Sequence, residues 1–255
     1  MKTFNELQEG LQDPNIFKTF FLAGGSGVGK SYVARYTTGG TGIRVVNSDD
    51  VFEKYLKAAG LSMKMGSEDP RRDELRGKAK KVTAERQANY IEGRMGLVID
   101  GTGKDYDKIR AHKSELESLG YDTHMIFVNT SVEVALERNE KRERTVPEDV
   151  AIISWKAVQS NIGKFSSLFR GTMIIVDNNK ADQDIEKATF KEVKRLLKKK
   201  VTNTRAKSWI EMEMKNRDIT KAPSRRNIGA GGGMNRAKTG PKDRFGKATF
   251  NKLPG

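Results

Sequence analysis

The stretch FFLAGGSGVGKSYVA, residues 21–35, decides the fold, because a glycine-rich turn joins an apolar run to a segment with helical spacing. It contains the pattern G-x-x-x-x-G-K-[ST], whose backbone N–H groups turn inward on the phosphates of a nucleotide. The lysine of this pattern reaches the β and γ phosphates, and the hydroxyl of its last residue binds Mg²⁺. The stretch therefore predicts a phosphate loop for ATP and Mg²⁺, made of Gly24, Gly25, Ser26, Gly27, Val28, Gly29, Lys30 and Ser31.

Short apolar runs rich in β-branched and aromatic residues predict five strands, at residues 17–23, 43–47, 97–100, 124–128 and 173–177. Most of these runs are nearly continuous in hydrophobicity, which is typical of strands covered on both faces. Segments with helical spacing lie between them, and this alternation favours right-handed crossovers and a parallel sheet. The predicted fold class is α/β, a three-layer P-loop NTPase fold with a parallel five-stranded sheet and a basic, largely irregular C-terminal extension.

The composition excludes several classes of site. The 255 residues include no cysteine and two histidines, which excludes a disulfide framework and a zinc site of the usual Cys/His kind. A catalytic metal would therefore have oxygen ligands, and Mg²⁺ suits a phosphate site. No apolar run approaches the roughly 20 residues that cross a bilayer, so we expect no membrane contact and a cytoplasmic protein, in the host cytoplasm if a phage encodes it.

The net charge of +15 is concentrated in the last quarter of the chain. Residues 187–255 hold 20 Lys and Arg against 5 Asp and Glu, whereas residues 1–186 hold 28 of each kind. We predict a P-loop domain at residues 1–200 and a basic, glycine-rich tail at residues 201–255, of which residues 205–218 fit either a helix or an alternating strand. Such a tail attracts nucleic acid through counterion release, or else it is a solubilising or protein-binding segment.

Two carboxylates are expected at the carboxyl edge of the sheet, where ligands of open α/β sheets bind. Asp49 follows the second strand and can accept the proton of a hydroxyl that attacks the γ-phosphate. Asp100 ends the third strand and can support the metal or orient the acceptor, or it can simply bond its own backbone in a turn. A structural alternative also exists at the second strand, where the helix expected from Val51 needs an N-cap that could be Ser48, Asp49 or Asp50.

The segment LERNEKRERTVPEDV, residues 136–150, places Arg138 and Arg142 four residues apart, on one face of a predicted helix, with Arg144 close by. A planar guanidinium suits phosphate oxygens, and an arginine brought to a transferring phosphoryl group contributes on the order of 10³ to 10⁵ in rate. The alternative is an exposed helix on which neighbouring glutamates pair with these arginines.

The order of the phosphate loop, NSDD, VIDGTG and ERNEKRERTVPEDV resembles the kinase domain of phage polynucleotide 5′-kinases over about residues 17–177. It is similar also to the zeta-toxin kinases, which phosphorylate nucleotide sugars, and DGTGK around Asp100 resembles their EGTGR segment. The resemblance implies that Asp49 is the general base, that Lys30 and Ser31 serve the nucleotide, and that Arg138 is a lid arginine. One position departs from the polynucleotide kinases, because Phe52 stands where they carry an arginine that contacts the acceptor's phosphate.

Three hypotheses follow from these patterns. The first is a kinase that transfers the γ-phosphate of ATP to the 5′-hydroxyl of a nucleic acid, which is held near a basic helix containing Arg71, Arg72 and Arg76 and assisted by the tail. In the second, the same chemistry acts on a nucleotide sugar or another small molecule. The third is a nucleotide-sensing protein whose tail docks on nucleic acid or on a protein assembly. The acceptor and the oligomeric state stay open at this point.

Overall fold

The computed structural model of the chain describes residues 11, 13–64, 69–180 and 182–221. All strands in this part belong to one parallel sheet, whose order is β2-β3-β1-β4-β5. The predicted five-stranded parallel sheet is therefore confirmed. The strands are β1 (Lys18–Ala23), β2 (Arg44–Val46), β3 (Leu97–Asp100), β4 (Asp122–Asn129) and β5 (Met173–Asp177).

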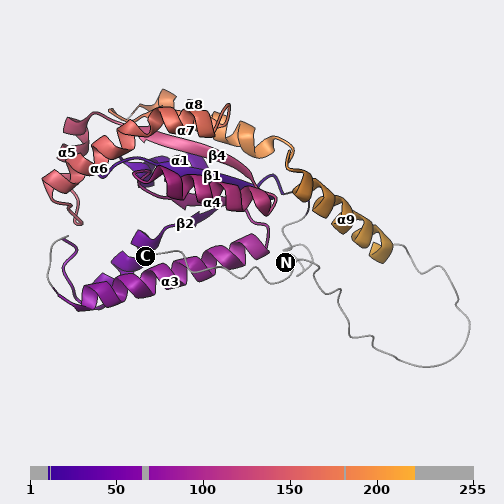
Figure 1. The fold of residues 1–255 in the computed structure, drawn as a ribbon, viewed down its shortest axis with the longest axis horizontal. Helices are drawn as coiled ribbons and strands as arrows, with labels where there is room; N and C mark the ends of the chain where they lie inside the picture. The colour runs from indigo at the N-terminus through magenta and orange to yellow at the C-terminus, as the bar shows by residue number, and fades with distance from the viewer. Residues whose placement is uncertain (1–10, 12, 65–68, 181, 222–255) are drawn as a thin grey trace, which may run out of the picture.

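Helices cover both faces of this sheet (Figure 1). Helices α1 and α8 pack on one face, α4 and α7 pack on the other, and α2 and α3 pack together beside β2. Within the described residues, no helix has the length and apolar character that crossing a membrane requires. The helices are α1 (Lys30–Thr38), α2 (Ser48–Ala58), α3 (Arg71–Glu92), α4 (Tyr106–Ser118), α5 (Val132–Glu140), α6 (Glu148–Ser160), α7 (Ile162–Leu168), α8 (Gln183–Lys198) and α9 (Thr204–Lys221).

The central strands are buried on both faces, which explains why their sequences read as continuous apolar runs. In β1, Phe20 and Leu22 point into the cluster under α1 and α8, whereas Phe21 and Ala23 point into the cluster under α4 and α7. All four side chains are buried. Because the core is filled from both sides, the carboxyl ends of the strands remain the edge at which polar groups can gather.

The segment at residues 148–169 is broken into two helices. Helix α6 ends at Ser160 and α7 begins at Ile162, with Asn161 between them. The buried side-chain amide of Asn161 donates to the carbonyl oxygens of Gly103 (3.2 Å) and Lys104 (3.0 Å), in the loop that follows β3. This amide therefore ties the α6–α7 junction to the carboxyl edge of the sheet.

Residues 204–221 form helix α9, which settles the choice between helix and strand that the sequence left open. The first half of α9 packs on the core: Ala206 is buried, and the indole of Trp209 meets the ring of Phe17 edge to face at 5.5 Å. The guanidinium of Arg94 lies 5.3 Å from the centre of the Trp209 ring. The rest of the predicted basic tail, residues 222–255, lies outside the described residues.

A buried ion pair connects the sheet to the segment between α8 and α9. Lys18 Nζ lies 2.8 Å from Asp122 Oδ2, and the two side chains are 1% and 9% exposed. Asp122 also accepts from the backbone N–H of Thr202 (2.9 Å) and of Asn203 (3.1 Å). The pair therefore sits at the amino ends of β1 and β4 and fixes the start of α9.

We predict that Asp122→Asn destabilises the protein by about 3 to 5 kcal/mol, because it leaves the Lys18 ammonium buried without a counter-charge. Burial opposes ionisation of Asp122, but Lys18 and Thr202 hold the pKa of this carboxyl below its usual value. The stabilisation is thus present above the ordinary aspartate pKa and is lost as the pH falls through the lower pKa of the folded state. Urea unfolding at pH 7 and at decreasing pH measures both effects.

Asp107→Asn is the matched control, because Asp107 makes an exposed pair with Arg110 on the surface of α4. Such pairs contribute roughly 0 to 1 kcal/mol. Equal urea midpoints for the two variants at pH 7 would show that the buried pair does not stabilise the fold.

Candidate active site

The phosphate loop adopts a left-handed backbone at Gly27 and Gly29, where an added side chain would also lie too close to its neighbours. Gly27 and Gly29 have φ of +77° and +88°. A Cβ on Gly27 would lie 1.9 Å from the carbonyl oxygen of Ala135 in α5, and one on Gly29 would lie 2.4 Å from Nδ2 of Asn178. The loop is therefore wedged against α5 on one side and against the segment after β5 on the other.

Two asparagines that the sequence analysis did not single out hold the loop in place. The buried Asn139 accepts from the Ser26 hydroxyl (3.3 Å), and the Asn178 side chain donates to the carbonyl oxygen of Val28 (2.8 Å). Arg138 donates to the carbonyl oxygens of Asn178 (2.7 Å) and Asn179 (3.3 Å). This arrangement places the Arg138 guanidinium directly beside the phosphate loop.

Lys30 is folded back over the loop that precedes it. Its ammonium donates to the carbonyl oxygens of Gly24 (2.9 Å) and Gly25 (3.0 Å). Burial lowers the pKa of Lys30, and the nearby charge of Asp100 partly opposes this shift. Ser31 is exposed in the first turn of α1, where the helix N-terminus favours an anion.

Asn47 joins the ends of β2 and β3. Its side-chain oxygen accepts from the N–H of Asp49 (2.7 Å) as the N-cap of α2, while its amide donates to Asp100 Oδ2 (2.8 Å). The expected cap at Ser48, Asp49 or Asp50 is therefore wrong, and the helix begins at Ser48, three residues before Val51. Because Asn47 is the N-cap of α2, the carboxylate of Asp49 does not cap this helix.

The Asp49 carboxylate lies between two arginines from different helical segments. Arg76 Nη1 in α3 is 2.5 Å from Asp49 Oδ1, and Arg144 Nη2, beyond the end of α5, is 3.4 Å from the same oxygen. Arg144 also lies 3.3 Å from Glu53 Oε1. Burial opposes ionisation of Asp49, but the Arg144 charge and the Arg76 hydrogen bond hold its pKa below the usual value.

Asp100 lies in the opposite electrostatic environment. Burial raises the pKa of Asp100 to about 6, and the Lys30 charge only partly offsets this rise. The two carboxylates at the sheet edge thus differ in proton affinity, with Asp49 the more acidic of the pair. Carboxylates whose pKa values are pushed apart are a mark of sites that divide acid–base and electrostatic tasks.

Phe52 is surrounded by guanidinium groups, although it stands where an arginine was expected from the resemblance. The guanidinium carbons of Arg76, Arg72 and Arg144 lie 5.0, 5.8 and 5.8 Å from the centre of its buried ring. The arginines beside Asp49 are therefore supplied by α3 and by the segment after α5, and not by α2. Of the three arginines that the sequence placed near the acceptor, Arg76 reaches Asp49, Arg72 is buried against Phe52, and Arg71 pairs with Asp69.

The expectation that Arg138 and Arg142 share one helical face is wrong. Helix α5 ends at Glu140, and the chain then turns back because the Asn139 side chain bonds both the N–H (3.2 Å) and the carbonyl oxygen (2.7 Å) of Val146. Arg142 lies in this turn and is exposed, yet its charge acts on both Lys30 and Asp100. The sequence analysis placed Arg144 only close to Arg138 and Arg142. It is the arginine that this turn brings to Asp49.

The donor set fits a nucleotide-bound Mg²⁺ better than a metal held by protein alone. Among the described residues, no group of three or more Asp, Glu, His or Cys side chains could hold a metal ion. Mg²⁺ is usually bound through one or two protein oxygens together with phosphates and waters. The exposed Ser31 hydroxyl and the Asp100 carboxylate at the same sheet edge are the residues that could hold it.

We predict that Gly27→Ala abolishes nucleotide binding and lowers the free energy of unfolding by at least about 1 kcal/mol. The added methyl cannot fit beside the Ala135 carbonyl, and alanine at positive φ is itself strained. Isothermal titration with ATP and urea unfolding measure the two effects.

Gly77→Ala is the matched control, because its Cβ would meet nothing within 4 Å in the middle of α3. We expect it to bind ATP normally and to gain about 0.5 to 1 kcal/mol from helix propensity. Normal ATP binding by Gly27→Ala would contradict the close packing of the loop.

Comparison with known proteins identifies the family to which the sequence belongs. The model of the zeta toxin family matches residues 6–189. No curated protein sequence matches the chain. The structure is similar to that of a putative kinase from Chloroflexus aurantiacus, with a TM-score of 0.52 and 14% identity over 71% of this chain and 98% of that chain.

Two further solved structures are similar at lower TM-scores. A protein of the PezAT toxin-antitoxin system of Streptococcus pneumoniae has a TM-score of 0.45 and 15% identity over 71% of this chain and 87% of that chain. A chain of the Pnkp1/Rnl/Hen1 RNA repair complex has a TM-score of 0.47 and 19% identity over 59% of this chain and 47% of that chain.

Proposed function

The chain belongs to the zeta toxin family of P-loop kinases, and from this premise we propose that it transfers the γ-phosphate of ATP to a hydroxyl of an acceptor that itself carries phosphate. The observation that carries the proposal is the position of Asp49, between the guanidinium groups of Arg76 and Arg144. A carboxylate can accept a hydroxyl proton, and guanidinium groups bind phosphate. A candidate base and two phosphate-binding groups therefore lie side by side at the edge of the sheet that also carries the phosphate loop.

On the donor side, the loop holds the triphosphate and Lys30 stabilises charge on its β and γ oxygens. When bound through Ser31 and Asp100, Mg²⁺ would neutralise further negative charge on those oxygens. Arg138 lies beside the loop and Arg142 lies within the electrostatic reach of Lys30, so these two arginines are the groups that close over the transferring phosphoryl. Most of this catalysis is positioning and electrostatic stabilisation.

On the acceptor side, Asp49 takes the proton of the attacking hydroxyl. The acceptor oxygen forms a bond to the γ-phosphorus, the bond from that phosphorus to the bridging oxygen of ADP breaks, and the hydroxyl proton passes to the Asp49 carboxylate. In the absence of acceptor, Arg76 and Arg144 keep this carboxylate a weak base by holding its pKa low. A phosphate on the acceptor would share these two cations, which raises the proton affinity of Asp49 when the substrate is in place.

The first candidate acceptor is a nucleotide sugar, which the resemblance to the zeta-toxin kinases implies. The family match over residues 6–189 includes Asp49 and the arginines beside it. The 5′-hydroxyl of a nucleic acid is the second candidate. The observation in its favour is Arg76, which brings a guanidinium to Asp49 although position 52 is a phenylalanine.

A screen with γ-labelled ATP tests the proposal directly. The acceptors are nucleotide sugars, free nucleotides, unphosphorylated sugars and an oligonucleotide with a 5′-hydroxyl, each incubated with the full chain and Mg²⁺. Label on a phosphate-bearing acceptor supports the proposal, and the labelled compound decides between the two candidates. Transfer to unphosphorylated sugars alone would overturn the role given to Arg76 and Arg144.

We predict that Asp49→Asn lowers the rate of phosphoryl transfer by roughly 10² to 10⁴, the usual contribution of a general base. ATP binding should stay within a few-fold of wild type, because the phosphate loop is intact. Asp50→Asn is the matched control, since Asp50 is the adjacent, exposed carboxylate. If Asp49→Asn turns over as fast as Asp50→Asn, another group acts as the base. If wild type transfers no phosphoryl group to any acceptor, the chain is a nucleotide-sensing protein.

We predict that Arg76→Ala raises the KM for the acceptor on the order of tenfold and leaves the KM for ATP within about twofold. Arg71→Ala serves as control, because Arg71 lies on the same helix but pairs only with Asp69 in the described structure. Steady-state kinetics with each substrate varied in turn separates the two constants. A rise in the KM for ATP alone would place Arg76 on the donor side.

A further inference from the structure

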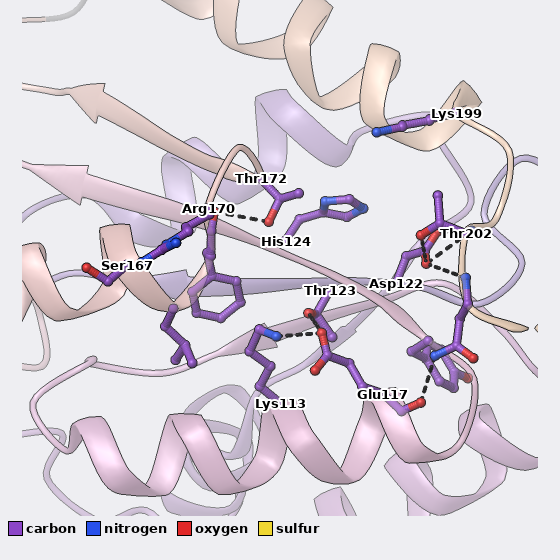
Figure 2. A pocket seen from close by; sticks show the side chains of 14 residues that line it. Lys113, Glu117, Asp122, Thr123, His124, Ser167, Arg170, Thr172, Lys199 and Thr202 are labelled. Carbon is purple, nitrogen blue, oxygen red and sulfur yellow. Dashed lines mark hydrogen bonds and ion pairs between the residues drawn. The ribbon is translucent and has the colours of Figure 1, made fainter. Parts of the chain in front are cut away.

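A groove of about 560 Å³ lies at the amino-terminal edge of the sheet, around the start of β4 (Figure 2). Its walls come from α4, from the turn between α7 and β5, and from the end of α8 with the segment that follows. The first residues of β4 form its floor, because pairing with β5 begins only at Met125. Since β4 is eight residues long, about 25 Å of strand separates this groove from the edge that carries the phosphate loop.

The groove has an excess of positive charge, because its carboxylates are already paired. Glu117 pairs with Lys113, and Asp122 pairs with Lys18. Arg170 and Lys199 also line the groove, from opposite walls, and both are exposed. Neither of them has a carboxylate partner among the residues that the structure describes, so two cations remain available to an anion.

The positive charge continues from the groove along the surface. Lys198, Lys199 and Lys200 are consecutive and exposed at the end of α8, and α9 extends from the same corner of the fold (Figure 1). Residues 187–217 contain eleven Lys and Arg against three Asp and Glu. We call this segment the basic band, and the groove lies beside its middle.

His124 provides a second indication of a ligand. Its imidazole forms part of the groove wall, is 3% exposed, and has no hydrogen-bond partner at either ring nitrogen within the described structure. Burial lowers the pKa of His124 to about 4, so the ring is neutral at pH 7 and offers one N–H donor. Buried polar groups normally have a partner, so two unsatisfied ring nitrogens at the wall of the groove point to a ligand oxygen that the groove would hold.

From this geometry we infer that the groove and the basic band bind the sugar-phosphate backbone of a nucleic acid. Arg170 and Lys199 each contact a phosphate from opposite walls of the groove, and the lysines at the end of α8 follow the backbone onto α9. An extended, repeating polyanion fits a cationic groove that continues into a cationic band, whereas a single small anion would leave the band unused. The inference does not depend on the acceptor, because the groove lies at the opposite ends of the strands from Asp49.

The test compares two double charge reversals in the full chain. Arg170→Glu with Lys199→Glu alters the groove, and Lys80→Glu with Lys81→Glu changes the net charge equally on the exposed side of α3. A fluorescent 20-nucleotide single-stranded RNA is titrated with each protein at several salt concentrations, and anisotropy gives the affinity. The same RNA is competed with inorganic phosphate and with poly-glutamate.

We expect the groove variant to bind RNA at least about tenfold more weakly than wild type, whereas the α3 variant stays within about threefold. The slope of log affinity against log salt should fall by about 1.4 in the groove variant, which corresponds to two lost phosphate contacts on a single strand. Phosphoryl transfer to the acceptor found in the screen should be unchanged, so failure of this inference and failure of the proposed function give different results.

Equal weakening by the two variants would overturn the inference, because overall charge alone would then explain binding. Competition by poly-glutamate as effective as competition by unlabelled RNA would also overturn it, in favour of an acidic protein partner. Inorganic phosphate at equal phosphate concentration should compete poorly. If the double reversal does not fold by circular dichroism, Arg170→Gln with Lys199→Gln replaces it, and the same comparison decides the question.

Discussion

The contact between Gly27 and the Ala135 carbonyl is the constraint on which the rest of the site depends. Without a side chain at position 27, the phosphate loop lies directly on α5, and the turn after α5 therefore lies close to the loop. Asn139 lies in the same helix, bonds the loop through Ser26 and closes the turn through Val146. One close backbone approach therefore sets the positions of the loop, of Arg138 and of the turn that delivers Arg144.

Asp49 and Asp100 show how burial and neighbouring charges shift the pKa values of two carboxylates in one site in opposite directions. Asp100 is more deeply buried, and the charge of Lys30 only partly offsets the cost of burial, so burial raises its pKa. Asp49 is also partly buried, but two guanidinium groups outweigh that cost. Asn47 bonds to both strand ends and holds these two environments next to each other.

The fold could be predicted from local patterns, because each strand is a continuous apolar run and the glycine-rich loop must stand between a strand and a helix. The order of the strands agrees with this pattern, since parallel pairing brings the residues after β1, β2 and β3 to one edge. The location of Asp49 and Asp100 at this edge could therefore be predicted from their positions in the sequence alone. The phosphate loop was found with equal ease, because each of its residues has a distinct steric or chemical task.

Other parts of the site depend on contacts between distant segments, and the sequence carries little sign of them. Arg76 reaches Asp49 only because α3 packs on α2, and Arg144 does so only because a side-chain amide ends α5 early. The N-cap was assigned to a residue one to three positions too late, although Asn47 is itself a favoured capping residue. An asparagine just before the first acidic turn of α2 was the signal that could have located it.

The Lys30 ammonium already makes hydrogen bonds within the phosphate loop, so nucleotide binding must replace these bonds with bonds to phosphate. In the free protein the ammonium already bonds two loop carbonyls, so a phosphate must replace bonds to neutral acceptors with bonds to an anion, and binding gains only the difference. The same bonds stabilise the loop in the absence of nucleotide and provide the buried ammonium with hydrogen-bond acceptors. The loop is thus held in shape before a nucleotide arrives, at the expense of part of the free energy that its contacts with phosphate would otherwise provide.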